Sequence, residues 1–468
     1  MKSKGILNRR EFLAVTTLVA VSARRARATA VPVGRTRPNI LFIMTDQQFA
    51  GAMSCAGNPD LKTPAMDHLA QHGTRFEKAY CSNPLCVPSR TVMMTGRMPH
   101  ETGIATNMAV HTSSFDTPML GHFFANAEYE CGYAGKWHLP VKLSQTERHG
   151  FSWFPEKNGT GSDVDIPAAA AQFFGRQRTQ PFLMVASFVN PHDICQWARG
   201  DTLPHGAIPD PPDAATCPAL PPNFALPEHE PDVIRRIQHS SKSVYPSVDW
   251  TPEKWRQYRW AYCRLVEKVD AQIGQVLDAL RKTGHENDTL IVFTADHGDG
   301  NAAHHWNQKQ VLYEEPTRVP FIVSGTPFAT AGVTDDTHLV STGLDLIPTL
   351  CDYAGVAVPD GLRGRSVRPL AEGGGVESWR DYIVSETEFE YEKTVTGIQG
   401  RMLRTQRHKY IVYSEGTLRE QLFDLTKDPG EMDNLAVNPD RKPLLEECRK
   451  QLGQWQRETG DTFTIPKG

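Results

Sequence analysis

Three runs of apolar residues constrain the fold of this chain most strongly. They cover residues 40–44, 182–189 and 290–293, and each is continuous, without alternation between apolar and polar positions. A continuous run of this length indicates a strand that is buried on both faces, as in a parallel sheet covered by helices. We therefore predict an α/β fold with a central, mostly parallel sheet between helices.

Each of these runs is followed by polar side chains. Asp46 follows the first run, Asn190 and His192 follow the second, and Asp296 and His297 follow the third. Any one of them alone is more typical of a loop cap or a solvated turn. Ligands of open α/β sheets bind beyond the carboxyl ends of the strands, however. Three such ends together predict a crevice where residues from distant parts of the sequence meet.

The remaining segments predict a scaffold helix, an irregular loop and a second, smaller domain. Residues 251–284 repeat apolar side chains at helical spacing after a Thr-Pro start, and Gly284 ends the run. The Pro-rich stretch 203–231 is typical of a surface loop, and we expect it to line the substrate site. Past residue 372, short alternating segments and a helix near 444–455 predict a small antiparallel sheet with a C-terminal helix. The predicted domains are residues 31–371 and 372–468.

Residues 1–30 have the pattern of a Tat-type signal peptide. Arg9 and Arg10 precede an apolar run at 13–23 and a small-residue cleavage motif at 28–30. The alternative is a basic N-terminal arm, but the three parts occur in the order of a signal. We expect a bacterial or archaeal host, the Tat export machinery as a partner, and a periplasmic or secreted protein.

Composition excludes several classes of protein. No run beyond residue 30 reaches the roughly 18 apolar residues of a membrane span. Residues 1–30 carry seven Lys or Arg and one Glu, a charge of +6, so without them the net charge of −4 becomes −10. An acidic protein is a poor partner for nucleic acid or anionic lipid.

The cysteines point to a single chemical centre. Nine are present, an odd number, so at least one has no intramolecular disulfide partner, and no CxxC pair suggests a zinc site. Cys86 precedes Pro88 by two residues, which suits the first turn of a helix, where amides and the dipole favour negative charge. Arg90 lies one turn further on the same face. This pairing suits nucleophilic attack on an anion.

The element Cys86-Val87-Pro88-Ser89-Arg90 resembles the signature of type I sulfatases of the alkaline-phosphatase-like superfamily, in which the cysteine is oxidised to formylglycine and hydrated to a diol. Further stretches in the family's order cover nearly the whole mature chain: 38–46, 95–97, 135–138, 190–192, 296–298 and 309–314. The resemblance implies hydrolysis of sulfate esters of a small organic molecule or a saccharide. It also implies a partner, a formylglycine-generating or anaerobic sulfatase-maturating enzyme.

The resemblance also assigns roles to individual residues. It makes modified Cys86 the nucleophile and Arg90 the group that anchors it. Lys136, Lys309 and His192 are implied to hold the sulfate oxygens, with His192 protonating the departing alcohol. His138 is implied to accept the proton whose loss releases sulfate from residue 86.

A single divalent metal is implied at Asp46, Gln47, Asp296, His297 and an oxygen of residue 86. Carboxylate and amide oxygens favour calcium. The commonest family pattern has aspartate in place of Gln47 and often asparagine in place of His297. An imidazole ligand keeps manganese or zinc open.

Three alternatives remain open at this point. A phosphonate or phosphodiester hydrolase shares the fold, and an N-sulfate hydrolase shares the motifs. A catalytically inactive carbohydrate-binding relative is disfavoured, because every proposed catalytic position carries a reactive residue. The sequence does not identify the sulfated substrate, nor whether the enzyme acts at chain ends or within a polymer.

Overall fold

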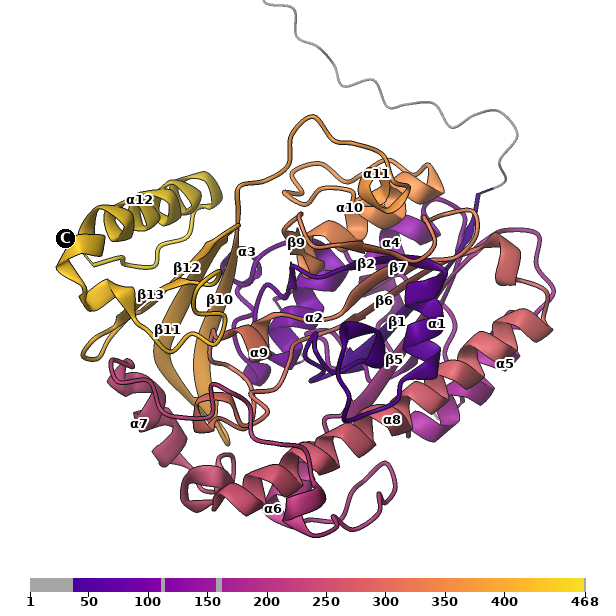
Figure 1. Ribbon diagram of the computed structural model, residues 1–468. Helices are drawn as coiled ribbons and strands as arrows, with labels where there is room; N and C mark the ends of the chain where they lie inside the picture. The colour runs from indigo at the N-terminus through magenta and orange to yellow at the C-terminus, as the bar shows by residue number, and fades with distance from the viewer. Residues whose placement is uncertain (1–36, 111–113, 157–161, 467–468) are drawn as a thin grey trace, which may run out of the picture. The chain divides into compact units, whose positions relative to one another are not determined.

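A seven-stranded sheet forms the centre of the computed structural model, which describes residues 37–110, 114–156 and 162–466 (Figure 1). The predicted signal peptide lies outside the described residues. The strands follow the order β4 (Glu130–Gly135), β5 (Phe182–Pro191), β1 (Asn39–Asp46), β6 (Thr289–Ala295), β7 (Phe321–Ser324), β2 (Gly73–Phe76) and β8 (Val333–Asp335).

The three apolar runs are the middle strands of this sheet. Strand β1 pairs in parallel with β5 on one side and with β6 on the other, with Ile40 opposite Leu183 and Leu290. The predicted central parallel sheet is therefore confirmed. The sheet is mixed, because β7 runs antiparallel to both β6 and β2.

Helices cover both faces of the sheet, which explains why β1 is apolar at successive positions. Leu41 and Ile43 pack towards one helical layer, whereas Ile40, Phe42 and Met44 pack towards the other. The first layer contains α1 (Pro64–Gln71), α5 (Ile166–Phe174), α6 (Ile194–Arg199) and α8 (Pro252–Lys282). The second contains α2 (Cys86–Thr95), α4 (Leu120–Ala125), α10 (Thr342–Ala354) and α11 (Arg368–Ala371).

Helix α8 confirms the predicted scaffold helix. Thr251 caps it, since its side-chain oxygen accepts a hydrogen bond from the Lys254 amide, and Pro252 occupies the first helical position. Its apolar stripe, including Leu265, Val269 and Ile273, is buried against the sheet. The stripe is therefore structural, as the sequence indicated.

A second sheet lies towards the C-terminus, on the left of Figure 1. It is antiparallel, in the order β10 (Tyr382–Tyr391), β11 (Thr394–Thr405), β12 (His408–Tyr413) and β13 (Glu420–Asp424), and α12 (Lys442–Thr459) packs on it. This matches the predicted antiparallel sheet and helix, while the boundary after residue 371 stays a prediction. Shorter strands and α-helices lie between these elements: β3 (Ala79–Tyr80), β9 (Val340–Ser341), α3 (Pro99–Thr102), α7 (Asp232–Ser240) and α9 (Glu314–Thr317).

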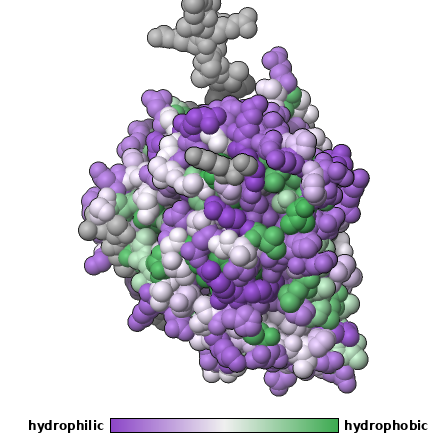
Figure 2. All heavy atoms as spheres, turned by 90° about the vertical axis from the view of Figure 1, so that its left-hand side faces the viewer, coloured by the Kyte–Doolittle hydropathy of each residue, from purple (hydrophilic) through white to green (hydrophobic). Residues whose placement is uncertain are grey.

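The face on the side of this second sheet is mainly hydrophilic, with hydrophobic residues in small groups (Figure 2). Large hydrophobic side chains that are exposed, such as Leu226, Val395 and Leu418, are far apart in the sequence. Within the described ranges, no helix is both long enough and apolar enough to cross a membrane.

Candidate active site

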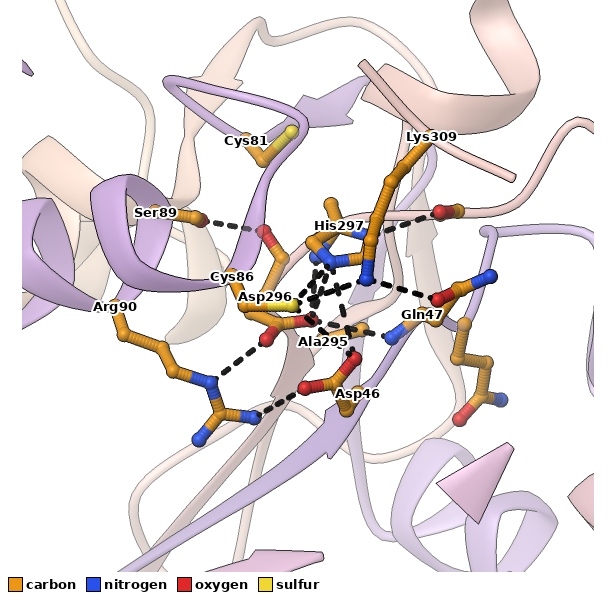
Figure 3. Close-up of polar contacts among 12 residues, drawn as sticks. Asp46, Gln47, Cys81, Cys86, Ser89, Arg90, Ala295, Asp296, His297 and Lys309 are labelled. Atoms are coloured by element: carbon orange, nitrogen blue, oxygen red, sulfur yellow. Dashed lines mark hydrogen bonds and ion pairs between the residues drawn. The ribbon is translucent and has the colours of Figure 1, made fainter. Parts of the chain in front are cut away.

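Two acidic side chains meet at the carboxyl ends of the central strands. Asp46 is the last residue of β1, and Asp296 follows β6 directly; both are fully buried. Because β1 and β6 are parallel neighbours, their ends lie at the same edge of the sheet. The predicted convergence of Asp46, Asp296 and His297 is present (Figure 3). Asn190 instead donates a hydrogen bond to Asp163, at 2.9 Å.

Cys86 is the first residue of helix α2, as the sequence indicated. Leu85 precedes it in extended conformation, and all ten residues of the helix are buried. Pro88 falls in the first turn, where a missing N–H costs nothing. The amide of Val87 donates to Asn107 Oδ1 at 2.9 Å, so one of the free amides of the first turn is satisfied by a side chain.

Basic side chains and the Asp46 carboxylate lie close to the Cys86 sulfur. Lys309 Nζ is 3.1 Å away, His297 Nε2 3.2 Å, Lys136 Nζ 3.8 Å and Asp46 Oδ1 3.8 Å. Lys136 also forms an ion pair with Asp46. Residues from four separate segments of the chain therefore surround one buried sulfur, as Figure 3 shows for three of these neighbours.

This surrounding charge sets Cys86 apart from every other cysteine. Burial raises its pKa, but Lys136, Lys309 and His297 outweigh burial, and the pKa of the Cys86 thiol is well below its usual range. The other eight cysteines all have raised pKa values, chiefly through burial. All nine cysteines are free. Position 86 is therefore built to hold a negatively charged or strongly polarised atom.

Arg90 fixes the two acids in place. Its Nε donates to Asp296 Oδ2 at 2.7 Å, and its Nη2 donates to Asp46 Oδ2 at 3.0 Å, with all three side chains fully buried. Its Nη1 donates to Ser187 Oγ at 2.8 Å and to the Lys136 carbonyl at 3.1 Å. Burial lowers the pKa of Arg90, yet the two carboxylates raise it above the ordinary value, so the guanidinium stays charged.

His297 presents one ring nitrogen to the site. Its Nδ1 lies 2.9 Å from the Gly298 carbonyl, which can only accept, so Nδ1 carries a proton and Nε2 faces the Cys86 sulfur. Position 298 has to be glycine, because a Cβ there would lie 1.9 Å from the Glu315 carbonyl oxygen. This close approach allows the turn that aims His297 at Cys86.

The donor atoms of four residues fit a shared cation. Asp46, Cys86, Asp296 and His297 each offer one atom, and these atoms all lie within 4.8 Å of one another. His297 Nε2 is 3.7 Å from Asp46 Oδ1 and 3.6 Å from Asp296 Oδ1. Oxygen ligands at calcium distances of about 2.3–2.6 Å are separated by about this much around one ion.

Gln47 lies beside this group, held by a residue that sequence reasoning missed. Its Oε1 accepts from Lys309 Nζ at 3.0 Å, and its Nε2 donates to Asp299 Oδ2 at 2.7 Å. Asp299 is fully buried and also accepts from the Tyr258 hydroxyl. In the sequence, Asp299 is visible only as a second acid three residues after Asp296. That spacing alone does not predict that Asp299 orients Gln47.

A cavity of about 960 Å³ adjoins the site, and Lys136, His138 and His192 line it. Burial lowers the pKa of both histidines; for His192, Lys309 and Lys136 add to this effect, and its pKa is about 4. His138 has a left-handed backbone at φ 44°, and its buried Nδ1 has no hydrogen-bond partner among the described residues. Pro204 and His205, from the predicted Pro-rich loop, also line this cavity.

Comparison with known proteins identifies the family. A family model described as Sulfatase matches residues 38–356, and one described as N-sulphoglucosamine sulphohydrolase, C-terminal, matches residues 302–458. The chain is 33% identical to a Delta 4,5-hexuronate-2-O-sulfatase from Bacteroides thetaiotaomicron, over 91% of this chain and 90% of the relative. An N-acetylglucosamine-6-O-sulfatase from the same organism is 28% identical, over 91% and 87%. A solved 2-O GAG sulfatase structure superposes with a TM-score of 0.79 at 31% identity, over 92% and 94%. The chain therefore belongs to the sulfatase family and is a sulfuric ester hydrolase.

Proposed function

We propose that this sulfatase removes sulfate from an acidic saccharide, with a formylglycine made from Cys86 as nucleophile and one divalent metal ion beside it. The observation that supports this most directly is the surroundings of Cys86. Its buried sulfur contacts Lys309 and His297, while Lys136 both approaches it and lines the adjoining cavity.

The cations close to residue 86 are suited to a sulfate group. Lys136 and Lys309 both approach residue 86, so an anion placed there meets two ammonium groups. His192 lines the same cavity and is the proposed donor of a proton to the departing alcohol. His138, on the same lining, is the proposed acceptor of the proton from residue 86. Arg90 holds Asp46 and Asp296 rigidly beneath this position.

The proposed metal ligands are Asp46, Gln47, Asp296, His297 and the oxygen of modified residue 86, whose place the Cys86 sulfur takes in the structure. A bound divalent ion supplies Lewis-acid stabilisation of negative charge on that oxygen. Calcium is the first candidate because most of the donors are oxygens, and the His297 imidazole keeps manganese and zinc in the test. Elemental analysis of purified protein decides between them.

The proposed substrate class follows two of the relatives compared above. One relative is named for a 2-O-sulfated hexuronate and another for 6-O-sulfated N-acetylglucosamine. The higher identity and coverage of the first favour a 2-O-sulfated uronic acid saccharide. The C-terminal match to a model named for an N-sulphoglucosamine sulphohydrolase makes N-sulfated glucosamine the necessary competitor in the assay.

Two measurements test this proposal. Trypsin should release residues 79–90, which contain Cys81 as well as Cys86, and the peptide from active enzyme should be about 18 Da lighter than the unmodified one. Fragment ions should place the loss on residue 86, with Cys81 as the internal control. Full activity from protein whose Cys86 is wholly unmodified would contradict the mechanism.

The second measurement compares sulfate release from an aryl sulfate, a 2-O-sulfated hexuronate disaccharide and N-sulfated glucosamine. An aryl phosphate monoester and a phosphonate ester complete the panel. We expect the hexuronate to have the highest kcat/KM. Faster turnover of the phosphorus esters would instead favour the phosphonate hydrolase alternative.

We also propose export through the Tat machinery, with maturation by a formylglycine-generating or anaerobic sulfatase-maturating enzyme. The support is the sequence of residues 1–30 and the Cys-x-Pro-Ser-Arg element. Replacing Arg9 and Arg10 by lysine should retain the protein in the cytoplasm of a bacterial host. N-terminal sequencing of the exported protein should find cleavage close to residue 30.

A further inference from the structure

A buried aspartate and a histidine form a pair on the wall of the cavity, outside the group around Cys86. Asp193 immediately follows His192 and precedes helix α6, and His205 lies twelve residues further on in the Pro-rich loop. His205 Nδ1 is 2.7 Å from Asp193 Oδ1, and the His205 amide donates to Asp193 Oδ2 at 3.1 Å. Both residues line the cavity together with Lys136 and His192.

This pairing is unusual for an aspartate at the start of a helix. Such a side chain normally accepts a hydrogen bond from the first turn. The Asp193 side chain makes no capping bond to α6, and both of its oxygens accept from His205 instead. The carboxylate therefore holds the His205 ring in one orientation at the cavity wall.

The second ring nitrogen of His205 is left for a ligand. Since Nδ1 donates to Asp193, Nε2 is the remaining polar atom, and no residue of the described part of the chain forms a hydrogen bond with it. Burial lowers the pKa of His205, while Asp193 and the more distant Asp163 outweigh burial and raise it. A protonated ring presents an Nε2–H donor with positive charge.

Lys142 adds a second cation to the same lining. Its side chain is exposed, and its ammonium has no ion-pair partner in the ranges that the structure describes. Asp193 is the one acidic residue among the described residues that line the cavity, and its oxygens are occupied by His205. Beyond the cations assigned to the cleaved sulfate, the described part of the cavity lining therefore carries the Lys142 ammonium without an ion-pair partner and the His205 Nε2 atom without a hydrogen-bond partner.

We propose that His205 and Lys142 form a subsite for a second anionic group of the substrate, a carboxylate or another sulfate. The inference rests on the proposed function, since it takes this cavity as the place where the sulfated saccharide binds. His205, oriented by Asp193, is the specificity-determining residue, and it donates a charge-assisted hydrogen bond to the second anion. Trp137 and Phe154 on the same lining provide apolar surface for the sugar.

The test measures a selectivity ratio. For each variant, kcat/KM on a 2-O-sulfated hexuronate disaccharide is divided by kcat/KM on its carboxyl-reduced counterpart. A second ratio compares a disulfated with a monosulfated glucosamine. We expect His205→Gln to lower one of these ratios by about tenfold, as loss of one charge-assisted hydrogen bond implies. The ratio that falls identifies the anion as carboxylate or sulfate.

Two further variants make the outcome decisive. His338→Gln is the matched control, because His338 pairs with Asp335 at the same 2.7 Å distance and is not a lining residue of the cavity. Lys142→Gln changes an exposed side chain, so the inference remains testable even if His205→Gln folds poorly. Unchanged ratios for both His205→Gln and Lys142→Gln would overturn the subsite, even when the parent enzyme releases sulfate. A parent enzyme that releases no sulfate from any saccharide would refute the proposed function instead.

Discussion

Replacement of Asp299 by asparagine tests how the proposed metal site is held together. Asp299 accepts hydrogen bonds from Gln47 Nε2 at 2.7 Å, from the Tyr258 hydroxyl at 2.9 Å to both oxygens, and from the Asn301 amide at 2.7 Å. Lys309 Nζ donates to the opposite end of the Gln47 amide. Because Asp299 accepts from the NH₂ group of Gln47 and Lys309 donates to its oxygen, the Gln47 amide is held with its oxygen towards the site.

An amide at position 299 cannot satisfy all of these donors. Whichever way it turns, its NH₂ group faces a buried donor, which costs about 1–3 kcal/mol of folding stability. Loss of an outer partner that orients a metal ligand typically weakens metal binding by about 10–100-fold. We expect Asp299→Asn to fall at the lower end of that range, since one oxygen still accepts from Gln47 or Asn301.

Calorimetric titration of chelator-treated protein with Ca²⁺, Mn²⁺ and Zn²⁺ measures the affinity, and urea unfolding without metal measures the stability. Tyr258→Phe is the control, because it removes a donor to Asp299 but leaves the carboxylate that binds Gln47. Its metal affinity should stay within about threefold of the parent. Metal affinity of folded Asp299→Asn within about threefold of the parent, as for the control, would refute the idea that Asp299 positions a metal ligand.

Three other predictions concern single side chains. Asp46→Ala should abolish metal binding, which calorimetric titration measures, and retained stoichiometric metal would exclude Asp46 as a ligand. Because the variant leaves the buried Arg90 with one carboxylate fewer, it should also lower the free energy of unfolding by about 3–5 kcal/mol, which urea unfolding measures. His192→Ala should reduce kcat far more for a sugar sulfate than for a nitrophenyl sulfate, whose departure needs little proton transfer; equal losses would remove His192 from the role of acid. Burial lowers the pKa of His100, but the 2.5 Å contact of His100 with Glu386 outweighs burial and raises this pKa. The pair therefore stabilises the fold below the unfolded pKa of about 6.5, and the stabilisation is lost as pH rises through the pKa of His100 in the folded protein. His100→Asn should therefore be destabilised more at about pH 5 than at about pH 9, and a deficit in unfolding free energy that grows with pH would contradict this sign.

Local patterns in the sequence were sufficient for the central sheet and for the start of the helix that carries Cys86. The apolar runs around Ile43, Phe188 and Val292 identify strands because burial on both faces favours apolar residues at successive positions. The helix that begins at Cys86 is marked by Pro88 alone, since proline suits the first turn and few other places in a helix. These features depend on neighbours in the chain, so they can be read without the fold.

The small C-terminal sheet was predicted in outline, but its pairing was not. Along the chain, the short segments of strands β10 to β13 alternate with turn segments, and this pattern indicates antiparallel hairpins. The antiparallel direction of β7 within the main sheet has no counterpart in the sequence pattern, because an apolar strand reads alike in both directions. Strand direction depends on how the connecting segments cross the sheet.

The sequence by itself determined the fold class, the family resemblance and the residue types that meet at the strand ends. Only the tertiary structure decided which of them touch. It placed Arg90 between Asp46 and Asp296, set Asp299 behind Gln47, and turned His205 towards Asp193. Most of these contacts join residues far apart in the chain, and their geometry is set by the packing of whole helices and strands. Burial then gives them their strength, because a charge removed from water requires a partner at close range, and the sequence alone does not show which partner lies there.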